Sequence, residues 1–236
     1  MIDQVQFSDE RWLEFWANYK GLPHQKKAVA MLGKQIKAAD PCLLSESSEW
    51  VAGYKSSPAP YTIANPLKVA YQSQNDNGPS GFRECFSSSC AMLAMHWGAI
   101  KNDDAYNAVR SKFGDSTDAQ AQLSALRSLG LKADFHTDGN AGTLEAEINA
   151  GRPVAVGWLH HGSRNHPSGS GHWSVVIGYT NNGTSWIMND PNGQADLVAG
   201  GYTPNLNGAS VVYSRGNWNP RWMVGGSGGW YLRCRP

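Results

Sequence analysis

Residues 83–98 read RECFSSSCAMLAMHWG, and the rest of the chain is organised around this stretch. Small polar residues follow Cys85, as is favoured in the first turn of a helix, and Gly98 is a typical C-terminal stop. From Ala91 to Trp97 apolar residues face nearly all directions, which predicts a helix that is buried on all sides. Cys85 would then begin a central helix, where unpaired amides and the positive end of the helix dipole favour a thiolate.

The composition bounds the class of protein. A chain of 236 residues is long enough to bury a proper core, either as one large domain or as a domain with an appendage. Its formal net charge is +1 and it has no long run of lysine or arginine, so we expect no nucleic-acid partner. No apolar run is long enough to span a bilayer, so we expect no membrane partner either. We expect a monomer.

The N-terminus and the cysteines indicate a reducing compartment. The first six residues, MIDQVQ, lack the basic start and the apolar core of a signal peptide. We therefore expect a protein that is cytoplasmic as synthesised and that would reach a cell wall only with the help of another protein. Cys42, Cys85, Cys90 and Cys234 are interpreted as free thiols and not as a disulfide framework.

The chain is predicted to have two parts. Residues 1–60 are interpreted as a helical N-terminal segment and linker, with two helices over residues 8–40 and a stretch rich in serine and proline from residue 45. Residues 61–236 are predicted to form the main domain. It opens with a short strand over 67–71, whose residues alternate in polarity, and a polar loop then leads into the central helix.

Helices come first in the main domain and strands follow. After the central helix, Asn102 and Asp118 are expected to cap two further helices, the first reaching Phe113, and a strand is expected over 131–136. Leu144 and Ile148 lie on one face of a short helix. The predicted strands of the second half cover residues 153–159, 172–179, 186–189, 210–214 and 230–234. Helices followed by an antiparallel sheet indicate an α+β fold.

Four residues can be assembled into a site for cysteine catalysis, which needs a thiolate, a histidine, a group that orients the histidine and donors for an oxyanion. His172 begins one strand, and Asp190 follows the next. If these strands pair as a hairpin through 180–185, Asp190 comes near His172. Gln74, in the loop before Cys85, can donate its side-chain amide to the oxyanion together with the backbone amide of Cys85.

This ordered set resembles the papain-like cysteine peptidases related to bacteriocin-leader-processing enzymes, in their stand-alone form. In those relatives a Gln-x-Asp-Asn-like loop precedes a Cys-x-x-[Ser/Thr]-Ser-x-Ala-Met helix. The corresponding residues here read QNDN at 74–77 and CFSSSCAM at 85–92. The resemblance covers about residues 65 to 200 and implies a papain-like fold with a central helix that bears the cysteine and an antiparallel sheet that bears the histidine and aspartate.

The resemblance also implies roles for single residues. Cys85 would be the nucleophile, His172 the base, Asp190 the orienting group and Gln74 the oxyanion donor. No metal or organic cofactor is needed. Three further residues are candidates for substrate binding: Trp173, His161 and Asn189.

Simpler interpretations exist for several of these residues. Cys85 and Cys90 could both be core cysteines, and Cys90, inside the apolar run, is predicted to be one. A metal site that uses Cys85, Cys90 and His96 is poor, because no second close Cys/His pair completes a tetrahedron. Asp190 could cap a turn before a proline, and Gln72 rivals Gln74 as the oxyanion donor.

The predicted function is hydrolysis of peptide amide bonds through an acyl-enzyme. The favoured substrate is a peptide of cell-wall peptidoglycan, as for a phage-type lysin, because the flanks of the domain are similar to those in phage and bacterial proteins. The chain shows no transporter or double-glycine context, so the leader-cleaving role of the family is not implied. The alternatives are a processing endopeptidase, a non-catalytic papain-like module that binds a partner, and an acyl transferase.

Overall fold

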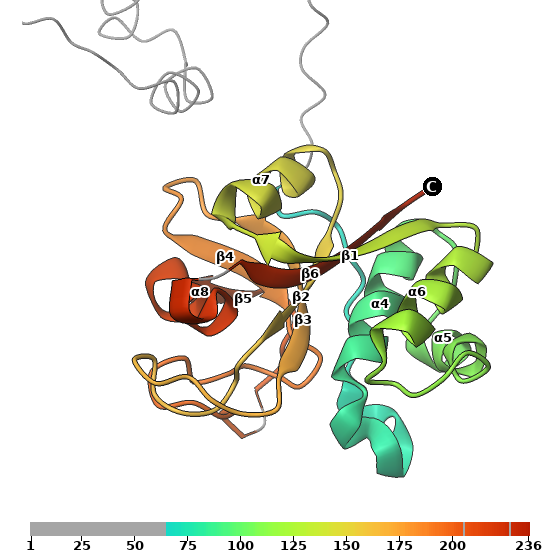
Figure 1. The fold of residues 1–236 in the computed structure, drawn as a ribbon, viewed down its shortest axis with the longest axis horizontal. Helices are drawn as coiled ribbons and strands as arrows, with labels where there is room; N and C mark the ends of the chain where they lie inside the picture. The colour runs from blue at the N-terminus through green and yellow to red at the C-terminus, as the bar shows by residue number, and fades with distance from the viewer. Residues whose placement is uncertain (1–64, 205, 227) are drawn as a thin grey trace, which may run out of the picture. The chain divides into compact units, whose positions relative to one another are not determined.

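A six-stranded antiparallel sheet forms the centre of the domain (Figure 1). The structure is a computed structural model that describes residues 65–204, 206–226 and 228–236. The predicted N-terminal helical segment and linker, residues 1–60, lie outside the described residues, as does Cys42.

The strands follow the order β1-β6-β2-β3-β4-β5 across the sheet. Their bounds are β1 Lys132–Gly139, β2 Val154–Trp158, β3 His172–Tyr179, β4 Ser185–Asn189, β5 Val211–Ser214 and β6 Gly229–Arg235. Each corresponds to a strand that the sequence predicts, to within a few residues. β6 comes from the end of the chain, yet it lies between β1 and β2 and pairs with both.

Helices cover both faces of the sheet. They are α4 Cys85–His96, α5 Asp103–Arg110, α6 Ala119–Ser128, α7 Ala141–Asn149 and α8 Arg215–Trp222, with short 3-10 turns η1 Gln74–Asp76, η2 Gly78–Arg83 and η3 Val224–Gly226. Figure 1 shows α4, α5 and α6 together on one side of the sheet, with α7 and α8 on the other side. The domain is therefore an α+β fold of three layers with the sheet in the middle.

Alternation along the strands builds one apolar core on each side. In β2, Ala155 belongs to the core beneath α4, whereas Val154 and Val156 belong to the core beneath α7 and α8. Successive side chains of a strand point to opposite faces, so a strand covered on both faces is apolar throughout. This explains why β2, with the sequence VAVGW, is apolar throughout.

The central helix is buried on all sides, as its composition predicts. Every residue from Phe86 to Ala94 is buried. Two of its three serines bond the neighbouring helices: Ser87 accepts a hydrogen bond from Gln122 at 2.9 Å, and Ser88 donates one to Asp103 at 3.1 Å. These contacts hold α4 against α5 and α6, and thereby hold the position of its first residue.

The predicted helix ends follow local hydrogen bonding. The Asn102 side chain accepts a bond from the Ala105 amide at 2.9 Å, and the Asp118 side chain accepts one from the Gln120 amide at 2.9 Å. Gly98 has a φ of +70°, which favours glycine, and follows α4 closely. Both predicted caps and the predicted stop are confirmed.

Three predictions of local structure are wrong. Residues 67–71 form no strand: the Leu67 amide bonds the Ile177 carbonyl at 2.7 Å, at a bulge of β3, and the segment does not continue the sheet. The helix predicted to reach Phe113 ends at Arg110, and Phe113 is 45% exposed. Helix α8 was not predicted, because Gly216 and Pro220 within it are typical of loops.

Among the described residues, no helix combines the length and the apolar character that crossing a bilayer requires.

Candidate active site

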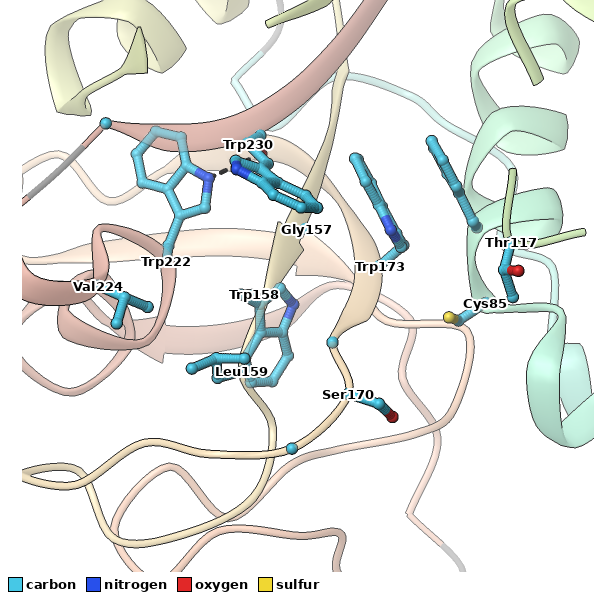
Figure 2. Close-up of a pocket in the computed structure, with 14 residues that line it drawn as sticks. Cys85, Thr117, Gly157, Trp158, Leu159, Ser170, Trp173, Trp222, Val224 and Trp230 are labelled. Carbon is cyan, nitrogen blue, oxygen red and sulfur yellow. Dashed lines mark hydrogen bonds between the residues drawn. The ribbon is translucent and has the colours of Figure 1, made fainter. Parts of the chain in front are cut away.

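Cys85 lies at one end of a pocket of about 480 Å³ between the central helix and the sheet. It is the first residue of α4 and is half-buried, whereas Cys90, one turn further on, is fully buried in the core. Figure 2 shows the sulfur of Cys85 facing the pocket, with Trp173 beside it and Trp222 and Trp230 at the opposite end. Of the cysteines that the structure describes, Cys85 is thus the one that a substrate can reach.

The hairpin of β3 and β4 brings His172 to Asp190. The two strands pair antiparallel, and the turn between them covers residues 180–184, one residue fewer than predicted. His172 is the first residue of β3 and Asp190 directly follows β4, and the distance from His172 Nε2 to Asp190 Oδ1 is 2.7 Å. The predicted approach of these two residues is confirmed. Cys85 also interacts with the imidazole and contributes to the raised pKa of His172. Because Nε2 is used by Asp190, Nδ1 is the ring atom left for the thiol.

The Asp190 carboxylate is fully buried and receives several further hydrogen bonds. Oδ2 accepts one from the Tyr213 hydroxyl at 2.9 Å, and Oδ1 accepts one from the Asn192 amide at 3.1 Å. The Tyr202 hydroxyl lies 3.3 Å from Oδ2. The bond from Asn192 is the turn-capping interaction that the sequence left open, so Asp190 caps its turn and pairs with His172 at the same time.

The charge of Asp190 favours a protonated His172. Burial lowers the pKa of His172, but the charge of Asp190, its hydrogen bond and the contact with Cys85 raise the pKa more, to about 10. A protonated imidazole beside a thiol stabilises the thiolate. The arrangement therefore favours a protonated imidazole beside the sulfur of Cys85.

The ion pair of His172 and Asp190 is expected to make the free energy of unfolding depend on pH. The unfolded His172 has a pKa of about 6.5, and the folded value is raised to about 10. Its contribution to the free energy of unfolding is therefore complete below about pH 6.5 and is lost as the pH rises through about 10. Urea unfolding at stepped pH should show a steeper alkaline loss in the wild type than in His172→Gln. Equal pH dependence in both proteins would contradict this expectation.

Gln74 lies in η1, in the loop before the central helix. Its side chain is 2% exposed, and Nε2 donates a hydrogen bond to the Gly81 carbonyl at 3.0 Å, which leaves one N–H of the amide. Gln72 is the alternative oxyanion donor that the sequence offers, but its side chain is used in another contact. Its Oε1 accepts a hydrogen bond from the Asp103 amide at the start of α5. Of the two glutamines, Gln74 is thus the one whose amide is buried beside the loop that leads into Cys85.

The three candidate substrate-binding residues lie in different surroundings. Trp173 lines the pocket and stacks on Phe86 with ring centroids 3.7 Å apart. His161 is exposed and lies in the loop before β3, outside the pocket lining. Asn189 is buried, and its amide bonds the backbone of Val69 and Ser210. The structure brings only Trp173 to the pocket.

Three rings form a cage around the His172 imidazole. Trp158 and Tyr202 contact the imidazole edge-on, with ring centroids 5.4 and 5.5 Å away, and His160 lies at 5.5 Å. Burial and the neighbouring His172 lower the pKa of His160 to about 4, so it is neutral. Trp158 lies at the end of an apolar strand that the sequence predicts, whereas His160 and Tyr202 are in loops.

The residues that the structure describes do not form a metal site. Within the part of the chain that the structure describes, no group of three His, Cys, Asp or Glu side chains is placed to hold an ion. In the set considered from the sequence, Cys90 is buried in the core and His96 contacts the carbonyls of Lys68 and Gly151.

The fold defines the class of protein. An α+β domain in which a half-buried cysteine begins a central helix, and in which that helix packs on an antiparallel sheet, is a papain-like cysteine peptidase. Residues 66–201 match the Peptidase_C39 like family, and the chain belongs to that family. The chain is thus a cysteine peptidase related to the bacteriocin-processing enzymes, as the resemblance of its motifs implied.

Solved structures with a similar fold include three peptidase domains. The peptidase domain of Streptococcus ComA, a bifunctional ABC transporter involved in quorum sensing, is 20% identical, with a TM-score of 0.45 over 66% of this chain and 93% of that one. A C39-like peptidase from Bacillus anthracis is 16% identical, with a TM-score of 0.49 over 72% and 95%. A double-glycine-motif protease from an AMS/PCAT transporter, in complex with its leader peptide, is 20% identical, with a TM-score of 0.47 over 73% and 94%. No curated protein matches the chain.

Proposed function

We propose that this peptidase hydrolyses peptide bonds through a Cys85–His172–Asp190 triad. The observation that carries the proposal is the imidazole of His172, which bonds Asp190 through Nε2 at 2.7 Å and also contacts Cys85. This is the linkage of nucleophile, base and orienting group that nucleophilic catalysis requires. A non-catalytic binding module has no need for a buried carboxylate paired with a histidine beside an accessible thiol.

The mechanism starts from the thiolate–imidazolium pair. The Cys85 sulfur attacks the carbonyl carbon and forms a C–S bond, and the carbonyl electron pair moves to its oxygen. As the oxyanion collapses, the C–N bond breaks and His172 gives its proton to the leaving amine, which leaves a thioester. His172 then takes a proton from water, whose oxygen attacks the thioester and releases the acid and the thiolate. Asp190 keeps the imidazole oriented throughout.

Two donors are proposed for the oxyanion. The backbone amide of Cys85 lies at the N-terminus of α4, where amides have no partner within the helix. The free N–H of Gln74 is the second, since its other N–H is held by the Gly81 carbonyl. A donor that is already fixed by a second hydrogen bond needs little reorganisation when the charge develops.

Replacing Gln74 by alanine is expected to lower kcat by about 100-fold with a smaller effect on KM, because an oxyanion donor acts mainly in the transition state. Gln72→Ala is the matched control, two residues away. It removes the bond to the Asp103 amide and should cost stability without a comparable loss of kcat. Initial rates of both variants on one peptide substrate test this, and equal losses of kcat in both would exclude Gln74 as the donor.

For the substrate we propose a peptide of bacterial cell-wall peptidoglycan. Apart from Cys85, the described residues that line the pocket have no ionisable side chain, and they include four tryptophans and four glycines. Glycines leave room beside the indoles, and indoles offer flat apolar faces. Such a lining suits the methyl side chains of the alanines in a stem peptide and the sugar rings to which stem peptides are joined.

The products of digestion test the proposal. Purified peptidoglycan and, separately, casein are treated with the wild type and with Cys85→Ala, and the products are analysed by mass spectrometry. Muropeptides cut at one defined amide by the wild type alone would support the nucleophile, the reaction and the substrate together. If casein is cleaved but peptidoglycan is not, the mechanism would be supported, the cell-wall substrate would be excluded, and a processing endopeptidase would be favoured. If neither is cut and Cys85 is inert to iodoacetamide, the triad proposal is wrong.

A further inference from the structure

Arg221 is a fully buried cation on α8 whose donors are all used by backbone carbonyls. Nε donates to the Leu197 carbonyl at 3.1 Å and Nη2 donates to it at 2.9 Å. Nη1 donates to the carbonyls of Leu159 and His161 at 3.1 and 3.0 Å, and Nη2 also reaches Gly162 at 2.8 Å. A guanidinium has five N–H donors in a planar fork, and here each one has a partner.

These four carbonyls belong to two separate loops. Leu159, His161 and Gly162 lie in the loop that runs from β2 to His172, and Leu197 lies in the loop that runs from Asp190 to β5. A buried carbonyl without a partner is destabilising. Arg221 therefore donates the hydrogen bonds that these loop carbonyls lack from the backbone, and it holds both loops against α8.

The two loops also touch each other closely. The Gly201 amide bonds the His160 carbonyl at 2.7 Å, and Gly200, with a φ of +89°, lies so near the Gly162 backbone that an added Cβ would be 2.3 Å from its carbonyl oxygen. The loops carry two members of the ring cage around His172. His160 comes from the first loop, and Tyr202, whose hydroxyl reaches the Asp190 carboxylate, comes from the second.

We propose that Arg221 is a positioning residue for catalysis: its guanidinium locks the two loops together, so that the rings of His160 and Tyr202 hold the His172 imidazole between Cys85 and Asp190. Arg221 does not touch the reacting atoms, and it reaches the pocket lining only through backbone hydrogen bonds with Leu159. We therefore infer that it acts on catalysis through His172. This inference rests on the proposed function, since it concerns the same Cys85–His172 pair.

The test measures the thiol directly and needs no substrate. The rate at which iodoacetamide alkylates Cys85 is followed by mass spectrometry of the Cys85 peptide, from about pH 6 to about pH 9. An ordinary thiol loses its reactivity below about pH 8.5, whereas a thiol paired with an imidazolium keeps it. At low pH, the reactivity of Cys85 above that of an ordinary thiol therefore reports how well His172 is held beside it.

Arg221→Lys keeps the charge, but an ammonium has three donors on one nitrogen and cannot serve four carbonyls as a planar fork does. We expect alkylation of Cys85 to be about tenfold slower than in the wild type near pH 6 and equal to it near pH 9. Ile148→Ala is the control for lost stability alone, because Ile148 is a core residue of α7 outside the ring cage. It should lower Tm and leave the pH profile unchanged.

Substitutions at two neighbouring glycines test the contact between the two loops without a change at Arg221. Gly200 and Gly201 both have a positive φ, so alanine strains the backbone at either position, but only at Gly200 would the new Cβ meet the other loop. Gly200→Ala should reproduce the loss near pH 6, and Gly201→Ala should not. If Arg221→Lys fails to fold, this pair decides the question.

Two results would overturn the inference. The first is a pH profile of Arg221→Lys, or of Gly200→Ala, that superimposes on that of the wild type. The second is an equal loss of reactivity in Ile148→Ala at an equal drop in Tm. If the wild-type Cys85 itself shows no excess reactivity near pH 6, the Cys85–His172 pair is absent, and the proposed function falls together with the inference.

Discussion

Cys85→Ala is expected to lower kcat/KM by at least about 10⁴-fold, because no other described residue of the pocket lining has a thiol to form the thioester. Any residual rate would come from the oxyanion donors and from substrate binding alone. The side chain is half-buried and the change removes one sulfur atom, so Tm should change by only a few degrees. Initial rates on a substrate that the wild type cleaves, together with thermal unfolding, measure both effects.

Cys90→Ala is the matched control, because the same change is made five positions further along the same helix. Burial raises the pKa of the Cys90 thiol well above its ordinary value, so this thiol stays protonated and unreactive. The alanine leaves a small cavity in the core beneath α4 and should lower Tm more than Cys85→Ala does. Its activity per folded molecule should equal that of the wild type. A loss of activity in Cys90→Ala as large as in Cys85→Ala would contradict the assignment of the nucleophile.

Asp190→Asn is expected to lower kcat by about 10² to 10⁴-fold with little change in the fold, since asparagine has the same shape. Asparagine can still bond His172, but it has no charge to stabilise the imidazolium. The pKa of His172 should then fall from its raised value of about 10 towards its ordinary range. The active thiolate–imidazolium pair would be lost at a lower pH than in the wild type.

The pH dependence of kcat/KM distinguishes an electrostatic role of Asp190 from a purely structural one. In Asp190→Asn the alkaline limb of kcat/KM should move to lower pH, whereas lost stability alone would lower the rate without moving the limb. Tyr213→Phe is the control, because it removes the hydroxyl that donates to Oδ2 at 2.9 Å and leaves the carboxylate charge in place. Its limb should stay close to that of the wild type. A limb that moves equally in both variants would mean that the charge of Asp190 is not what holds the proton on His172.

The two cysteines of α4 differ in chemistry because their surroundings in the fold differ. Both lie in a run of small and apolar residues on one helix, and the sequence separates them only by position, one at the start and one inside the run. In the structure the first faces a pocket and an imidazole, and the second faces Tyr106 and Cys234 in the core. The same side chain is thus accessible and paired in one place and buried and inert in the other.

Much of the fold follows from interactions between residues close in the sequence, which is why the sequence predicts it. The Asn102 and Asp118 caps act over two or three residues, and the burial of α4 follows from its own apolar run. The approach of Asp190 to His172 also follows from a local rule, because a short turn between two strands makes an antiparallel hairpin. The roles of Cys85, His172, Asp190 and Gln74 remain predictions, which the variants described above test.

What the sequence by itself determined is the order of β1 to β6 and of α4 to α7, the caps at Asn102 and Asp118, the hairpin and the family; it missed α8 and placed a strand at 67–71 that does not form. Only the tertiary structure placed β6 between β1 and β2, brought Tyr202 and Tyr213 to the Asp190 carboxylate, and buried Arg221 against two loops. Periodicity and capping report on neighbours within a few residues. The partners of Arg221 lie 24 to 62 positions away in the chain, and they meet it only because packing the helices on the sheet brings them together.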